Sequence, residues 1–147
     1  MPHTYTQNTI HVVFGTKNRV KAIPKEFQSK LWAYMAGICR NHKIVPVEVG
    51  GADDHTHLLL QIPPTITLSD AVSTIKANSS RWAYEEGRKF DWQQGYAAFS
   101  VSASSVASVV RYIQNQELHH KKRSLTEEWF ALLKKHGLDF DRRYALG

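Results

Sequence analysis

The chain has 147 residues, 42% of them hydrophobic and 22% charged, which is typical of a globular protein and excludes disordered and fibrous architectures, so we expect one domain over residues 1–147. No apolar run approaches the roughly 20 residues that cross a bilayer, and the first residues lack the pattern of a signal peptide, so we expect a soluble, cytoplasmic protein without membrane contact. The single cysteine, Cys39, excludes an internal disulfide and a multi-thiolate zinc site. The net charge of +6, with seven basic residues and one acidic residue over 1–43, favours an anionic partner without establishing nucleic acid.

The first half of the chain predicts a strand, a helix and a hairpin. Apolar and polar residues alternate over 8–16, which is the period of a strand. An apolar stripe with helical spacing then follows over 25–43. Alternating residues over 45–49, a Gly-Gly turn and a β-rich run over 55–62 predict a hairpin, and Pro46 favours a sheet edge for its first strand.

The second half predicts a helix, a strand and two further helices. Thr67 begins a helix that carries an apolar stripe, and a strand follows over 96–102. Another helix begins near Val106, and a capping box of Ser124 and Glu127 opens the last one.

The order of these elements indicates an α+β fold. Strand, helix, strand, strand, helix, strand is the βαββαβ arrangement of ferredoxin-like (RRM-like) antiparallel sheets, here with two additional C-terminal helices. The two crossover helices should cover one face of the sheet and leave the opposite face open.

A pair of histidines lies on the strand predicted over 55–62. Residues two apart on a strand point the same way, so His55 and His57 should project together, with His11 and Glu48 on the same face. The more apolar alternate positions should pack under the crossover helices, which directs both imidazoles to the open face. Neutral imidazole is the commonest metal ligand, so the pair is either a metal site or a chance surface pair.

The helix from Val106 offers further polar groups. Tyr112 and Gln116 are four residues apart and share a helix face at the edge of the apolar stripe. The helix can therefore dock by its apolar side and still present a phenol and a carboxamide to a neighbouring surface. A half-buried tyrosine with a solvated hydroxyl is the alternative interpretation of Tyr112.

Together these two motifs resemble a known family. His55-Thr56-His57, followed by the run from Tyr112 to Gln116, is similar to the paired signature of single-tyrosine HUH transposases of the insertion sequence 200/605 type. Segments 13–19, 76–82, 94–102 and 119–124 are similar in type and order, so the resemblance covers nearly the whole chain. Thr56 departs from the bulky hydrophobic residue usual in the family, although a β-branched side chain still suits a strand.

The resemblance implies a site and a reaction. Tyr112 would be the nucleophile, and His55, His57 and Gln116 would hold a divalent metal, with Mg²⁺ expected in cells and Mn²⁺ also supporting activity. The implied activity is that of a transposase which binds hairpin-marked single-stranded DNA ends and cleaves and rejoins them through a covalent 5′-phosphotyrosine.

The resemblance also implies partners and a location. A homodimer would build each site from His55 and His57 of one subunit and Tyr112 and Gln116 of the other, acting on nucleoid DNA in the cytoplasm of a prokaryotic cell. Basic side chains are expected to contact DNA phosphates. The candidates are Lys17, Arg19, Lys21, Lys76, Arg81, Lys121, Lys122 and Arg123.

Other functions stay open. A domesticated relative would act on chromosomal palindromic repeats, and a ferredoxin-like nucleic-acid-binding module would lack catalysis. Such a module needs exposed aromatic residues on its sheet for base stacking, and the predicted strands offer few. A small metal hydrolase would turn over its substrate without trapping it covalently.

Overall fold

The computed structural model describes residues 3–116, 123–142 and 145. Its sheet has four strands in the order β2-β3-β1-β4. They are β1 (Thr9–Gly15), β2 (Val45–Gly51), β3 (His55–Gln61) and β4 (Ala97–Ser100). All neighbouring strands are antiparallel, and β2 lies at an edge, as Pro46 indicated.

The longer helices begin where the sequence predicts. They are α1 (Lys25–Asn41), α2 (Leu68–Glu85), α3 (Val106–Gln114) and α5 (Leu125–Lys135). The Thr67 and Ser124 hydroxyls accept hydrogen bonds from the backbone N–H three residues on, which caps α2 and α5. Short 3₁₀ turns, η1 (Lys17–Arg19) and η2 (Ala103–Ser105), follow β1 and β4. Along the chain the longer elements follow one another as β1, α1, β2, β3, α2, β4, α3 and α5, which is an α+β fold with an antiparallel sheet.

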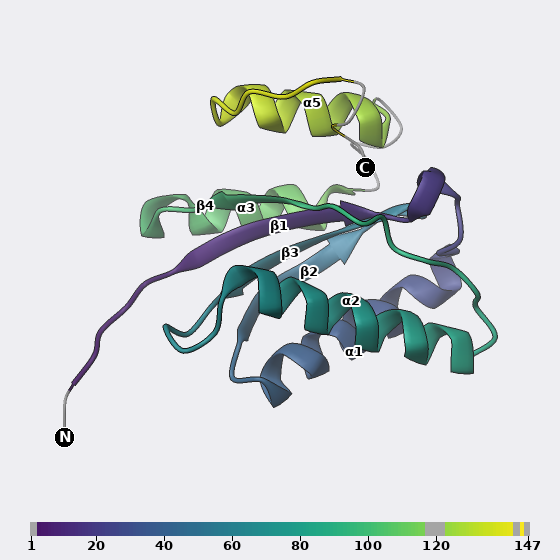
Figure 1. The fold of residues 1–147 in the computed structure, drawn as a ribbon, viewed down its shortest axis with the longest axis horizontal. Helices are drawn as coiled ribbons and strands as arrows, with labels where there is room; N and C mark the ends of the chain where they lie inside the picture. Colours follow the sequence, from purple (N-terminus) through teal and green to yellow (C-terminus); the bar gives the residue numbers. More distant parts are fainter. Residues whose placement is uncertain (1–2, 117–122, 143–144, 146–147) are drawn as a thin grey trace.

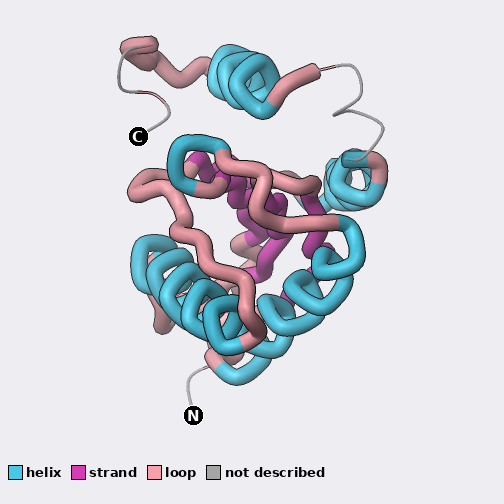
Figure 2. Tube along the Cα trace, turned by 90° about the vertical axis from the view of Figure 1, so that its right-hand side faces the viewer, coloured by secondary structure: helices cyan, strands magenta, loops and turns pink. Residues whose placement is uncertain are grey.

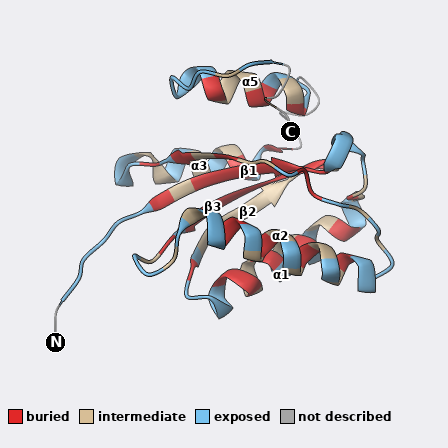
Figure 3. Cartoon of the chain, in the orientation of Figure 1, coloured by how far each residue is buried: buried red, intermediate tan, exposed pale blue. Residues whose placement is uncertain are grey.

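The sheet lies between two layers of helices (Figures 1 and 2). Helices α1 and α2 lie side by side on one face, where their apolar stripes pack against alternate strand residues such as Phe14, Leu58 and Leu60. Cys39 is buried in this cluster, as expected of a small core residue. The buried stripes of α1 and α2 turn toward the sheet, and their exposed stripes turn away from it (Figure 3).

The opposite face is not open, and this expectation was wrong. Helix α3 packs over β2 and β3, with Ile113 against Leu59. Helix α5 packs over β1 and β4, with Trp129 and Leu133 against Val13. The sequence predicted both helices but carried no signal for where they dock.

Two glycines allow this close docking. A Cβ at Gly50 would lie 2.8 Å from Cγ2 of Ile113 on α3, and a Cβ at Gly15 would lie 2.8 Å from Cδ2 of Leu125 on α5. Glycine in a strand often marks a place where another segment approaches closely. Within the described residues, no helix is both long and apolar enough to span a membrane.

Candidate active site

The two histidines of β3 lie at the middle of the sheet, on the side of α3 and α5. His55 pairs with Gly15 and His57 with Val13 across the β1–β3 ladder, and both imidazoles are fully buried. Their ring centroids are 5.1 Å apart, so the predicted common direction is confirmed. The predicted open surroundings are wrong because α3 and α5 cover both rings.

Each imidazole is oriented by a hydrogen bond at Nδ1. His55 Nδ1 donates to Asp54 Oδ1 over 2.8 Å, and His57 Nδ1 lies 2.8 Å from His11 Nε2. Burial and the neighbouring His57 lower the pKa of His11 to about 3, so the neutral ring can accept a hydrogen bond. With the proton of each ring placed on Nδ1, as these two contacts favour, both Nε2 atoms can act as metal ligands.

Gln116 reaches the same point from just beyond α3. Its Oε1 lies 3.0 Å from His55 Nε2, and its Nε2 donates to the backbone oxygen of Tyr112 over 3.3 Å. The prediction that Tyr112 and Gln116 lie on one helix was wrong, because α3 ends at Gln114 and Asn115 is not helical. Gln116 therefore reaches His55 from just beyond the break at Asn115.

Tyr112 on α3 meets a carboxylate from α5. The Tyr112 hydroxyl donates to Glu128 Oε1, and the same oxygen lies 2.9 Å from His57 Nε2. Glu128 Oε2 lies 3.8 Å from His55 Nε2. Burial of the phenol and the adjacent Glu128 carboxylate raise the pKa of Tyr112 above its ordinary value.

These five side chains form what we call the buried centre: His55, His57, Tyr112, Gln116 and Glu128. Ligand atoms of the two histidines and Glu128 all lie within 4.8 Å of one another. A carboxylate with 1% exposure is costly without a compensating cation, and imidazole, carboxylate and amide oxygens are all metal ligands. The donor set fits a divalent metal but does not identify which one.

Sequence reasoning missed Glu128. Along α5 the apolar stripe runs through Leu125, Trp129 and Leu132, and Glu128 occupies the position three residues after the first of these. A carboxylate on the buried stripe of an otherwise apolar helix face was the signal that could have found it.

The five side chains of the buried centre meet within one chain. Helix α3 lies on β2 and β3 of its own sheet and brings Tyr112 and Gln116 to His55 and His57 without a second subunit.

The predicted DNA-contacting residues are dispersed. Lys17, Arg19 and Lys21 are exposed in and after η1, and Arg123 is exposed just before α5. Arg81 lies on α2, on the other face of the sheet, where it donates to Asn78 Oδ1 over 2.6 Å. Lys121 and Lys122 lie outside the described residues, as do His119 and His120.

Lys76, also a predicted DNA contact, makes its hydrogen bonds within the fold. Its Nζ donates to the backbone oxygens of Gln93, Gln94 and Gly95 at 2.8–3.1 Å. The ammonium group also lies over the rings of Phe14 and Tyr96. Three hydrogen bonds account for all three of its donors, so Lys76 anchors the segment before β4.

Comparisons with known proteins agree with this fold. The model of the family described as IS200-like transposases matches residues 4–116. The transposases for insertion sequence element IS200 of Salmonella typhimurium and Salmonella typhi are each 28% identical over 125 residues, which cover 79% of this chain and 81% of theirs.

Two solved structures share the fold at low identity. A Deinococcus radiodurans R1 protein classed as a transposase matches with a TM-score of 0.62 and 23% identity, over 79% of this chain and 96% of its own. A REP-associated tyrosine transposase bound to a REP hairpin matches with a TM-score of 0.59 and 16% identity, over 98% of this chain and 89% of its own. With the family match spanning well over half of its length, the chain belongs to the IS200-like transposase family.

Proposed function

We propose that this chain is a transposase that cleaves and rejoins single-stranded DNA, with Tyr112 as nucleophile and a divalent metal held by His55, His57 and Gln116. The observation that carries the proposal is the convergence of a phenol, two imidazoles and an amide oxygen at one buried point. Family membership and the antiparallel strand order support it, and that order also supports the ferredoxin-like assignment.

The proposed step exchanges one phosphorus–oxygen bond for another. The Tyr112 oxygen attacks the phosphorus of a phosphodiester and loses its proton, while the bond to the 3′-oxygen breaks. That oxygen takes up a proton and leaves as a 3′-hydroxyl, and the 5′ end stays joined to the enzyme as phosphotyrosine. A later 3′-hydroxyl reverses the step, so rejoining needs no ATP.

Glu128 has two places in this proposal. It accepts the hydrogen bond of the Tyr112 hydroxyl, so it is the described group best placed to take the phenol proton. Its carboxylate also faces both imidazoles and would serve as a further ligand. The metal, when bound, supplies Lewis-acid stabilisation of the charge on the phosphate oxygens, and we expect Mg²⁺ with Mn²⁺ as a substitute.

The proposed substrate is a single strand marked by a hairpin. The solved relative bound to a REP hairpin supports this choice. Three basic residues, Lys17, Arg19 and Lys21, follow the end of β1. Arg123 lies two residues before Leu125, whose side chain approaches Gly15 at the same end of β1. Basic residues from two segments thus gather near the His55 end of the sheet, where they could contact phosphates.

Formation of a covalent adduct tests the proposal. An oligonucleotide carrying a palindrome from the DNA that flanks the reading frame should give a denaturation-resistant, metal-dependent adduct with the wild-type protein. Tyr112→Phe should give none, whereas Tyr84→Phe, which alters an exposed tyrosine on α2, should react normally. Equal adduct with Tyr112→Phe would overturn the assignment.

We propose a homodimer with shared sites as the functional assembly, although the five side chains of the buried centre also meet within one chain. Mixing His57→Ala with Tyr112→Phe subunits discriminates between the two assemblies. Shared sites would restore part of the adduct, because one composite site would keep both groups. Sites built from one chain would restore none.

A domesticated relative is the second candidate. The match to a REP-associated tyrosine transposase over 98% of this chain favours it, and such a protein would act on chromosomal palindromic repeats. The genomic location of the palindromes discriminates the two: an insertion element carries them at its own ends, and a domesticated enzyme finds them elsewhere. In both cases we propose action on nucleoid DNA in the cytoplasm of a prokaryotic cell.

A further inference from the structure

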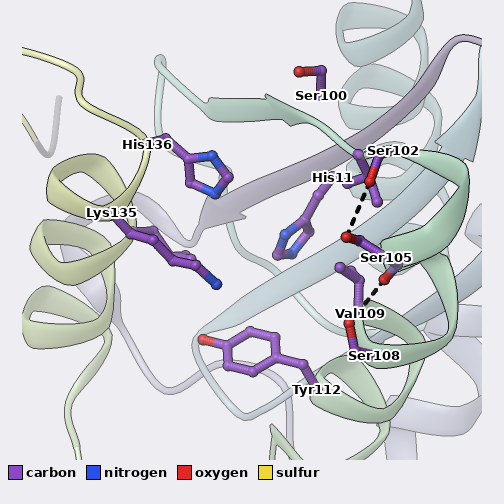
Figure 4. A pocket seen from close by; sticks show the side chains of 11 residues that line it. His11, Ser100, Ser102, Ser105, Ser108, Val109, Tyr112, Lys135 and His136 are labelled. Atoms are coloured by element: carbon purple, nitrogen blue, oxygen red, sulfur yellow. Dashed lines mark hydrogen bonds between the residues drawn. The ribbon is translucent and has the colours of Figure 1, made fainter.

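A cavity of about 550 Å³ opens beside the buried centre, between the end of β4, η2, α3 and the last turn of α5 (Figure 4). We call it the serine cavity because Ser100, Ser102, Ser105 and Ser108 line it. His11, Tyr112, Lys135 and His136 are the other polar residues of its described lining. Its volume lies within the range of cavities that hold small organic ligands, about 300–1,000 Å³.

The lining of the serine cavity suits an anion with polar substituents. Among the described residues, its lining contains no carboxylate, and the Lys135 ammonium points into the same space as the His11 and His136 rings (Figure 4). Hydrogen bonds position three of the serine hydroxyls: Ser102 Oγ donates to Ser105 Oγ over 3.0 Å, and Ser108 Oγ donates to the Ser105 backbone oxygen over 3.0 Å. Each hydroxyl keeps acceptor or donor capacity for a ligand.

An aromatic surface lies at the rim of the cavity. His136 stacks on Phe99 with a centroid distance of 4.2 Å and an interplanar angle of 16°. The residue is nevertheless exposed, so its ring keeps a face on which a nucleobase can stack. The cavity therefore combines a cation, hydroxyls and a supported ring, as a nucleotide requires.

The cavity also lies beside Tyr112, the proposed nucleophile. His55, His57, Gln116 and Glu128 are each at most 1% exposed. Tyr112 is only partly buried, and it alone of the buried centre lines the cavity. A strand whose phosphate approaches the Tyr112 oxygen from this side must place a neighbouring nucleotide in the serine cavity.

We propose that the serine cavity binds the nucleotide adjacent to the scissile phosphate, with Lys135 paired to its phosphate group and the serine hydroxyls bonded to its polar edges. This assignment rests on the proposed function, because the scissile phosphate is defined by Tyr112. It gives α5 a role in holding substrate as well as in covering the buried centre.

Binding of a mononucleotide tests this directly. Thymidine 5′-monophosphate, titrated into the wild-type protein and followed by NMR, should shift the signals of Val101, Val109 and Leu132 saturably. Lys135→Gln should weaken this binding by roughly tenfold, since a charge-assisted hydrogen bond is lost. Lys134→Gln makes the same change on the same turn outside the cavity and should leave binding unchanged.

The results that would contradict the cavity assignment differ from those that would contradict the proposed function. Shifts confined to other surfaces, no saturable shift, or equal weakening by both variants would overturn the cavity assignment even if Tyr112 forms an adduct. Unphosphorylated thymidine should bind more weakly, and equal binding would remove the role given to Lys135. If the cavity serves the reaction, Lys135→Gln should also raise the oligonucleotide concentration that gives half-maximal adduct, and Lys134→Gln should not.

Discussion

The two faces of the sheet are built on different principles. Against α1 and α2 the strands present a continuous apolar surface, formed by residues such as Val12, Phe14, Leu58 and Leu60. Against α3 and α5 the apolar contacts form two separate clusters, and the polar buried centre lies between the helices that carry them. The first face is a core, and the second is a site closed by two helices.

The two faces therefore contribute differently to the stability of the fold. Burial of apolar side chains stabilises the α1/α2 face without any requirement for partners. On the other face, the side chains of His11, His55, His57, Gln116 and Glu128 are buried, and each is costly unless it is paired. We therefore expect the α3/α5 face to be the one that a metal stabilises.

The largest effect should come from the apolar face. Leu58→Ala removes a fully buried side chain from the cluster under α1 and α2, and it should lower the free energy of unfolding by about 2–5 kcal/mol. Leu133→Ala on α5 should cost less, because the residue lies at the outer cluster and is 9% exposed. Denaturant unfolding measures both, and equal losses would show that the two faces are one cooperative core.

Hydrogen exchange tests the same difference between the two faces of the sheet. Leu133→Ala should accelerate exchange of the α5 amides and leave those of β1 and β3 protected, since local opening needs only the α5 contacts. A uniform acceleration over all strands would contradict the division into core and covering helix.

The next effect concerns metal binding. Glu128→Gln keeps the shape of the side chain but removes the charge that faces both imidazoles, so Mn²⁺ affinity should fall by about 10- to 100-fold. Titration calorimetry or the Mn²⁺ resonance signal measures it. Glu127→Gln, one residue earlier on the exposed side of α5, is the matched control and should bind normally.

Unchanged affinity in Glu128→Gln would exclude the carboxylate as a ligand and leave His55, His57 and Gln116 as the donor set. The Tyr112 hydrogen bond could persist in this variant, because the glutamine oxygen can still accept. Metal affinity and adduct formation would then report separately on the two roles of residue 128.

The sequence could predict the apolar face because its signals are local. The strand alternation around Val12, the stripe after Pro24 and the cap at Thr67 each depend on neighbouring residues, and the structure confirms the elements they predict. The direction of His55 and His57 also followed from the two-residue period of β3.

The other face depends on contacts that sequence spacing does not encode. Glu128 meets His57 across 71 positions of the chain, and only the docking of α5 beside Gly15 brings them together. The break after Gln114 likewise opposes the continuous helical period that linked Tyr112 to Gln116. Tertiary packing decides both features, whereas residue patterns decide the elements themselves.

Acid should weaken the metal-free protein through the polar face. The folded-state pKa of His11 is about 3 against an ordinary 6.5, so the unfolded chain binds a proton between these values that the folded chain does not. The stability that His11 contributes is therefore present above pH 6.5 and is lost as the pH falls toward 3. Denaturant titrations across this window should show a shallower loss in His11→Gln than in the wild type.

His42→Gln makes the same substitution at an exposed histidine and should retain the wild-type profile. Identical profiles for His11→Gln and the wild type would assign the acid sensitivity to other groups.

The smallest expected effects distinguish Lys76, which holds backbone oxygens within the fold, from Lys17, which is proposed to contact DNA. Lys76→Met removes three hydrogen bonds to the backbone oxygens of residues 93–95 and should destabilise the fold by about 1–3 kcal/mol. It should leave the salt dependence of single-stranded DNA binding unchanged. Lys17→Met, in the exposed η1 turn, should preserve stability and lower the salt slope by about 0.7, the value for one phosphate contact. The reverse pattern would make Lys76 the DNA contact and Lys17 the structural residue, because each readout responds to only one of the two roles.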